Sequence, residues 1–269
     1  MLEALNYEFI QNAILAGLLV SFASGIIGSL IVVNRMVFLA GGIAHTSYGG
    51  IGLAVYFGFP IFLGASLFAV LSAILMAIIT LNQREKIDTF IGLIWAVGMA
   101  IGIILIDLTP GYSVDLMSYL FGSILAVSSA DITYMSVLLT FIILIVTIFY
   151  RQILAVSYDS EYAQLRGINI KLFYTLILIL SALTVVISIK VVGLILVIAL
   201  LTIPIYIAEK FSDSLGGMMF ISGLLSSIFT LSGLYLSYEY NITSGATIIL
   251  VSAVCLILFL IITKFKKTI

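Results

Sequence analysis

His45 has the most distinctive chemistry in this chain, because it is the only histidine among 269 residues. It lies in the apolar segment FLAGGIAHTSYGGIGL, residues 38–53, where glycine and hydroxyl side chains surround the imidazole. An ionisable side chain inside a membrane span is costly unless it faces a polar cavity or a partner. Imidazole is also a good ligand for zinc, manganese or iron. We therefore predict that His45 contacts an ion that crosses the membrane, with Ser47 and Tyr48 as neighbouring polar candidates.

A second interpretation of His45 is structural: the ring is one partner of a buried hydrogen bond that packs two helices. A single histidine also cannot hold a metal ion by itself, so a metal site needs further ligands. The sequence contains no HExxH motif, no serine–histidine–acid set and no paired intramembrane carboxylates. An intramembrane enzyme is therefore not favoured, and no cofactor is predicted for the chain itself.

A mixed-charge loop at residues 151–171, RQILAVSYDSEYAQLRGINIK, is the second segment with distinctive chemistry. Ser157 and Asp159 can accept hydrogen bonds from the free amide groups at a helix start. Glu161 places negative charge in the first turn, where the helix dipole favours it. These signals predict a helix of about two turns within residues 157–168.

This helix should end at Gly167, which offers the left-handed conformation that ends helices, with Arg166 in the last turn. Tyr162, Leu165 and Ile168 recur at three-residue spacing and give it an apolar stripe. About two turns of helix do not persist alone in water, so something must pack on the stripe. The stripe packs either on the membrane domain of the same chain, as a connector would, or on a soluble partner.

The rest of the chain is too apolar for a soluble globular domain, since 63% of its residues are hydrophobic and 9% are charged. Apolar stretches long enough to cross the roughly 30 Å hydrocarbon layer recur from end to end. We predict an all-α polytopic membrane bundle in lipid, with one transmembrane domain over residues 1–269. The net charge of −1 does not favour a nucleic-acid partner. The single cysteine, Cys255, cannot form a disulfide within the chain.

The apolar stretches predict about eight or nine transmembrane helices. The predicted spans are 10–33, 37–58, 61–81, 90–107, 131–150, 171–189, 191–208, 215–237 and 244–263. Residues 116–128 are too short to cross, so they form either a shallow or re-entrant helix or an extension of a neighbour. Small residues, such as the GxxxG pair Gly98 and Gly102 and the cluster at Ser222 and Gly223, predict close helix packing or a dimer interface.

The basic residues predict the orientation of the chain in the membrane. With nine spans and the N-terminus outside, ten of the eleven Lys and Arg residues fall on the cytoplasmic side. Only Lys190 falls outside. The loop at residues 151–171 then faces the cytoplasm, where a soluble partner can reach it.

Five segments carry a resemblance to a known family: VVNRMVFLAGGIAHTSYGGIGLA, DLMSYLFGSIL, YDSEYAQLRGI, VVGLILVIALLTIPIYIA and SGATIILV. In this order they resemble motifs of the permease subunits of the bacterial and archaeal metal ABC importers, which take up zinc, manganese or iron. The resemblance extends over most of the chain, and several motifs in order are more specific than any one of them.

The resemblance implies a multi-pass protein of a prokaryotic cell membrane that forms a dimeric pore, here a homodimer, for a divalent metal ion. It implies two protein partners, a cytoplasmic ABC ATPase that binds the ATP and an extracytoplasmic metal-binding protein. The matching positions of the translocation pathway are His45, Ser47 and Tyr48, with His45 as the metal contact. Those of the ATPase contact are Asp159, Glu161, Tyr162, Leu165, Arg166 and Gly167.

One position departs from the family pattern. Members commonly carry an aspartate four residues before the histidine, and here that residue is Gly41. The implied metal contact therefore reaches His45 alone.

The leading hypothesis is thus the translocation subunit of an ATP-driven importer of divalent metal ions. The chain has no GxxxxGK[ST] phosphate-binding loop, so the energy has to arrive from a partner through the helix at residues 157–168. The alternative is a stand-alone ion-coupled secondary transporter. That class usually needs buried acidic residues for the coupling ion, whereas the acidic residues here mostly lie at span ends.

Overall fold

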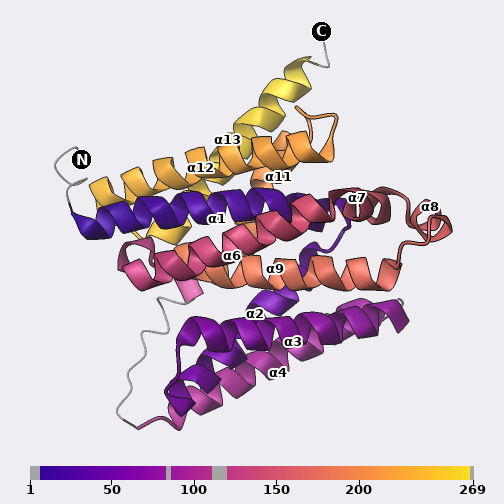
Figure 1. The fold of residues 1–269 in the computed structure, drawn as a ribbon. Coiled ribbons are helices and arrows are strands. Elements are labelled where there is room, and N and C mark those ends of the chain that lie inside the picture. Colours follow the sequence, from indigo (N-terminus) through magenta and orange to yellow (C-terminus); the bar gives the residue numbers. More distant parts are fainter. Residues whose placement is uncertain (1–6, 83–85, 111–119, 267–269) are drawn as a thin grey trace. The chain divides into compact units, whose positions relative to one another are not determined.

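A computed structural model describes residues 7–82, 86–110 and 120–266, and within these ranges it contains helices and no strand (Figure 1). Seven of the described helices are long and apolar enough to cross a membrane. They are α1 (Glu8–Val33), α3 (Ile61–Asn82), α4 (Ile87–Asp107), α6 (Ser129–Ile148), α9 (Ile170–Val192), α12 (Leu215–Tyr240) and α13 (Ser244–Lys266). The predicted all-α polytopic membrane bundle is confirmed.

The helix that carries His45, α2 (Val37–Phe57), is as long as these seven but contains the polar residues 45–48. With α2 included, eight of the nine predicted spans each correspond to one continuous helix. The predicted ends agree with the observed ends to within three residues, because the length of an apolar stretch sets the length of a membrane helix.

The predicted span at residues 191–208 is wrong as a continuous helix. Two short helices, α10 (Val197–Leu200) and α11 (Ile203–Ala208), occupy most of this range. Gly193 adopts φ = 87°, which turns the chain just after α9. Pro204, at the start of α11, has no N–H to bond to a carbonyl one turn earlier. Apolarity could not reveal the break, because glycine and proline are tolerated in membrane helices.

The described helices group into two compact units, each built from separate stretches of the chain. Unit 1 comprises Met1–Ser29, Met117–Leu139 and Lys190–Ile269, and unit 2 comprises Leu30–Leu116 and Thr140–Ile189. Since α1, α6 and α9 each contribute to both units, the grouping does not follow the order of the chain. A single domain over residues 1–269 stays a prediction.

In unit 1, small and hydroxyl residues join α1 to α12. Ser21 lies 3.1 Å from the Thr230 hydroxyl, and Ser29 lies 3.3 Å from the Ser222 hydroxyl, so the two helices run antiparallel. Between these pairs, a Cβ on Gly25 would collide with the backbone of α12. The close packing predicted from the small residues near Ser222 is therefore confirmed within one chain.

Residues 193–214, which contain α10 and α11, connect the two ends of unit 1. Lys190 at the end of α9 forms an ion pair with Asp131 at the start of α6, with 3.8 Å between Nζ and Oδ2. Ser129, also at the start of α6, donates a hydrogen bond to Glu8 at the start of α1. Because α12 runs antiparallel to α1, it begins at the opposite end, and residues 193–214 must cover that distance.

The predicted short segment at residues 116–128 is only partly described, because residues 116–119 lie outside the described ranges. From Gly122 onward it contains one 3-10 turn, η3 (Ile124–Ala126), in place of a continuous helix. The N–H of Ser123 donates to the carbonyl of Lys190 at 3.1 Å. This bond ties the segment to the end of α9.

In unit 2, α2 packs closely on both α3 and α4, while α3 and α4 make few contacts with each other. Figure 1 shows the three helices together, in indigo to magenta. A Cβ on Gly50 would collide with the backbone of Gly64 in α3, and one on Gly52 would collide with that of Gly102 in α4. The GxxxG pair Gly98 and Gly102 thus packs against α2 of the same chain.

Candidate functional site

His45 lies near the middle of α2, with 7% of its surface exposed. Its Nδ1 is 2.8 Å from the carbonyl oxygen of Gly41, one turn earlier in the same helix. A carbonyl oxygen only accepts hydrogen bonds, so we infer that Nδ1 carries the proton and that Nε2 of the neutral ring keeps its lone pair. Metal-binding histidines are commonly oriented in this way, with the second ring nitrogen donating to a carbonyl. The geometry fits a histidine that supplies one ligand to an ion.

Trp95 of α4 contacts His45, and the sequence analysis did not identify it. Its indole stacks on the His45 imidazole, with 3.7 Å between ring centroids and 30° between ring planes. Its Nε1–H points to the sulfur of Met99, 3.0 Å away. The one available signal was that the only tryptophan of the chain lies three residues before the first glycine of the pair at Gly98. The imidazole is thus held by its own helix on one side and by α4 on the other.

The three pathway candidates of α2, which are His45, Ser47 and Tyr48, differ in their neighbours and in the helix face on which they lie. Tyr48 is 2% exposed and packs against Gly102 of α4, so it shares a neighbouring helix with His45. Ser47 is fully buried, and its hydroxyl donates to the carbonyl of Ala44 at 2.6 Å. Successive helix residues are about 100° apart, so Ser47 lies on a different face from His45. The assignment of all three residues to a pathway stays a prediction.

The described residues contain no cluster of three or more His, Cys, Asp or Glu side chains that could hold a metal ion. An ion beside His45 would therefore need further ligands of another kind. These could be carbonyl or hydroxyl oxygens, or residues of a second copy of the chain. The structure brings together an imidazole, a stacked indole and glycine-lined backbone. This arrangement offers one imidazole ligand and does not form a complete metal-binding cage.

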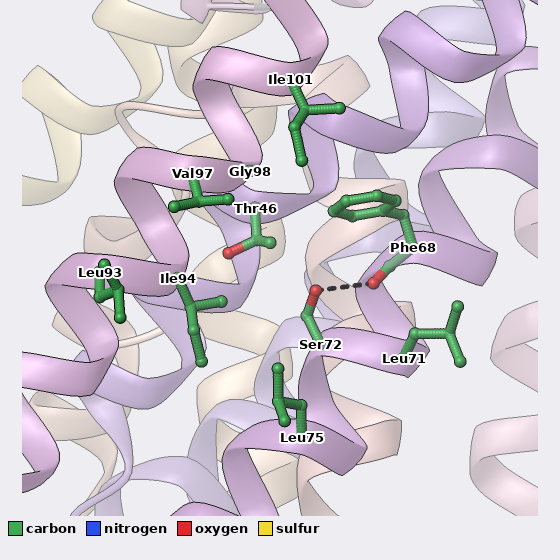
Figure 2. Close-up of a pocket in the computed structure, with 10 residues that line it drawn as sticks. All are labelled: Thr46, Phe68, Leu71, Ser72, Leu75, Leu93, Ile94, Val97, Gly98 and Ile101. Carbon is green, nitrogen blue, oxygen red and sulfur yellow. Dashed lines mark hydrogen bonds between the residues drawn. The ribbon is translucent and has the colours of Figure 1, made fainter.

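A cavity of about 340 Å³ lies beside α2, between α3 and α4, and is lined mainly by aliphatic side chains (Figure 2). Its polar lining residues are Thr46 and Ser72, whose hydroxyls donate to the carbonyls of Gly42 and Phe68. His45 is not among the lining residues. The cavity therefore offers no charged ligand to an ion, although it borders the same helix.

The helix predicted within residues 157–168 is present as α8 (Ser160–Leu165). The Asp159 carboxylate accepts a hydrogen bond of 2.9 Å from the N–H of Tyr162, which is the predicted N-cap contact. Gly167 adopts φ = 75°, and the N–H of Ile168 donates to the carbonyl of Ala163 at 3.0 Å. These two features form the Schellman motif that ends a helix.

Two of the three residues of the predicted apolar stripe, Tyr162 and Leu165, are exposed in the described part of the chain, and the third, Ile168, is half-buried. Tyr162 is 50% exposed and Leu165 is 87% exposed, whereas Ala163 is fully buried and anchors the helix. Glu161 is exposed in the first turn, and the Arg166 guanidinium lies 5.6 Å from the centre of the Tyr162 ring. The outward surface of α8 is formed by Glu161, Tyr162, Leu165 and Arg166. It combines two apolar side chains with one charge of each sign.

A separate helix, α7 (Tyr150–Tyr158), precedes α8 and was not predicted. Ser157 lies in its last turn and does not cap α8. Instead, the Ser157 hydroxyl accepts a hydrogen bond of 2.9 Å from the Asn34 side chain. The partner is 123 residues away in sequence, so no local pattern could indicate it. The cap role expected for Ser157 is therefore wrong, and Asp159 alone has it.

The helices and these two sites define a multi-pass membrane protein with a buried polar helix and an exposed, capped connecting helix. The model of the ABC 3 transport family matches residues 6–263, so the chain belongs to that family. An uncharacterized membrane protein of Synechocystis sp. is 48% identical over 99% of this chain and 94% of its own length.

Two further relatives carry more informative names. The manganese transport system membrane protein MntC of Listeria monocytogenes is 32% identical over 93% of this chain and 89% of its own length. The solved structure of PsaBC from Streptococcus pneumoniae in complex with Fab has a TM-score of 0.87 at 31% identity, over 96% of this chain and 93% of that chain. The resemblance stated from the sequence motifs is confirmed at the level of the family.

Proposed function

We propose that this protein is the membrane-spanning translocation subunit of an ATP-driven importer of divalent metal ions. The observation that carries the proposal is α8, which is capped at both ends and leaves Tyr162 and Leu165 exposed. A two-turn helix with exposed apolar side chains needs a partner to cover it, and the positive-inside pattern predicts that it faces the cytoplasm. A cytoplasmic ABC ATPase is the partner that fits the family.

The substrate of the proposed importer is a divalent ion, which touches His45 as it passes. The name of the Listeria relative supports a metal, and the free Nε2 of His45 is a suitable ligand for manganese, zinc or iron. We further propose that two copies of the chain form the pore, because one histidine does not make a site. An extracytoplasmic metal-binding protein then delivers the ion, and the ATP is bound by the partner.

The test is co-purification followed by transport. The tagged protein should retain a soluble ATPase, and vesicles that contain both should take up manganese, zinc or iron, supplied one at a time, only when ATP is present. Uptake driven by an ion gradient with the purified protein alone would instead support a secondary transporter. Cells that lack the protein should lose growth when that one metal is limiting and regain it when the metal is supplied in excess.

A further inference from the structure

The junction between α1 and α2 is short and rigid. Only three residues separate the two helices, and Arg35 among them adopts the left-handed φ of 57°. The N–H of Met36 donates to the carbonyl of Ile31 at 2.8 Å, and that of Arg35 to Val32 at 3.1 Å. This is again a Schellman motif, and Met36, which is 1% exposed, is both its last residue and the residue before α2. Any displacement of the end of α1 therefore moves the start of α2.

Asn34 attaches this junction to the segment that carries α8. Its side-chain N–H₂ donates both to the carbonyl of Leu30, at 2.8 Å, and to the hydroxyl of Ser157, at 2.9 Å. We call the second of these contacts the Asn34–Ser157 bridge. The bridge is partly buried, where a hydrogen bond is less exposed to competition from water.

The other side of the bridge is equally rigid. Ile153 and Val156 of α7 are buried, at 0% and 8% exposure, so α7 is held within unit 2. Asp159 is at once the C-cap residue of α7 and the N-cap residue of α8. A single residue therefore connects the exposed helix to the helix that carries Ser157 in its last turn.

The junction also has space to move. A polar cavity of about 350 Å³ lies beside it and is lined by residues of the junction, of the end of α3 and of the starts of α4 and α9. Arg35, Thr80 and Asp88 are among the lining residues. A turn that borders a cavity can shift without displacing a packed core.

We propose that the Asn34–Ser157 bridge transmits movement of α8 to α2, and so links the state of the ATPase to the position of His45. This inference rests on the function proposed above and names Asn34 and Ser157 as positioning residues. In this proposal neither residue binds the ion or the ATPase directly. Their loss should therefore leave assembly intact and reduce the metal moved per ATP hydrolysed.

The first experiment is a double-mutant cycle on the complex of the full chain with its ATPase. Ser157→Ala removes the bridge and keeps the Asn34 bond to Leu30. We expect it to lower transport of manganese, zinc or iron per ATP by about three- to tenfold, the range that one hydrogen bond supports. Asn34→Ala removes the bridge and also the bond to Leu30, so it should lower the ratio at least as much. The double variant should be no worse than Asn34→Ala alone, because that variant has already lost the bridge.

Two variants control this cycle. Ser157→Thr keeps the hydroxyl and should restore the ratio. Asn12→Ala removes another asparagine–serine contact between helices, the 3.3 Å bond to Ser129 in unit 1, and should leave the ratio unchanged. A fall in protein abundance at a constant ratio of transport to ATP hydrolysis would show that the bridge is only structural and would overturn the proposal.

The second experiment does not depend on transport. In the purified full chain, Ser157→Ala should accelerate hydrogen exchange of the amides at Arg35 and Met36 by about three- to tenfold, because their turn loses its tether. Unchanged exchange at these amides would overturn the proposal, whatever the transport data show. If the wild-type complex moves none of the three metals, the proposed function fails, and the exchange result still decides whether the bridge connects the two elements.

Discussion

Two helices, α2 with His45 and α8 in the loop before α9, are held in place by different kinds of contact. In α2, the residue before the helix makes no side-chain cap, and every residue from Leu39 to Gly52 is buried. Its position is set by glycine contacts with α3 and α4. In α8, both ends are defined by local hydrogen bonds, and only Ala163 is buried. The difference indicates that changes in α2 should act first on folding, whereas changes in α8 should act first on a partner.

The largest effect is expected from Gly52→Leu in α2. A side chain at this position collides with the backbone of Gly102, which cannot move aside as a flexible side chain can. We expect a loss of about 3 kcal/mol or more in stability, seen as a fall in membrane abundance and melting temperature. Gly92→Leu in α4 is the matched control, because a Cβ there meets nothing within 4 Å. Equal abundance of the two variants would contradict the glycine packing.

The next effect separates the chemistry of α2 from its packing. His45→Phe keeps a ring that can stack on Trp95 but removes both nitrogens. We expect metal transport to fall by about 10- to 100-fold, as for other groups that support metal binding, while abundance stays near that of wild type. His45→Ala should lose the same transport and some stability, since an aromatic pair contributes about 0.5–1.5 kcal/mol. Wild-type transport by His45→Phe would remove the imidazole from the pathway.

On the α8 side, Leu165→Glu should change binding without changing folding. The side chain is 87% exposed, so a carboxylate there costs the fold little. On the partner it would place a charge in an apolar contact, and we expect at least about a tenfold loss of ATPase co-purification. Gln164→Ala, at the neighbouring exposed position, serves as the control. Undiminished co-purification with Leu165→Glu would show that α8 is only a connector.

The smallest effect is expected at the cap of α8. Asp159→Ala removes the acceptor for the Tyr162 N–H and should cost about 1 kcal/mol of local helix stability. Hydrogen exchange of that amide should accelerate about fivefold, the factor that corresponds to 1 kcal/mol. Ser160→Ala, in the same turn, should have less effect. Equal exchange in both variants would contradict the capping role.

Several features of the fold were predictable because their causes lie within a few consecutive residues. The span lengths follow from the lengths of apolar stretches, and the start and end of α8 follow from Asp159 and Gly167, each acting within one or two turns. The exposure of Tyr162 and Leu165 was one of two alternatives that the sequence left open. The structure decided it, because exposure depends on what the rest of the chain leaves uncovered.

The remaining features depend on residues that are distant in sequence. The sequence determined by itself that this is a helical membrane protein, that α8 has its two ends and that His45 is the one imidazole in an apolar helix. Only the tertiary structure showed the Trp95 stack, the break after Gly193, the glycine contact of Gly52 with Gly102 and the Asn34–Ser157 bridge. The physical reason is that apolar length and capping bonds are local properties, whereas a side-chain partner on another helix is fixed only when the helices pack.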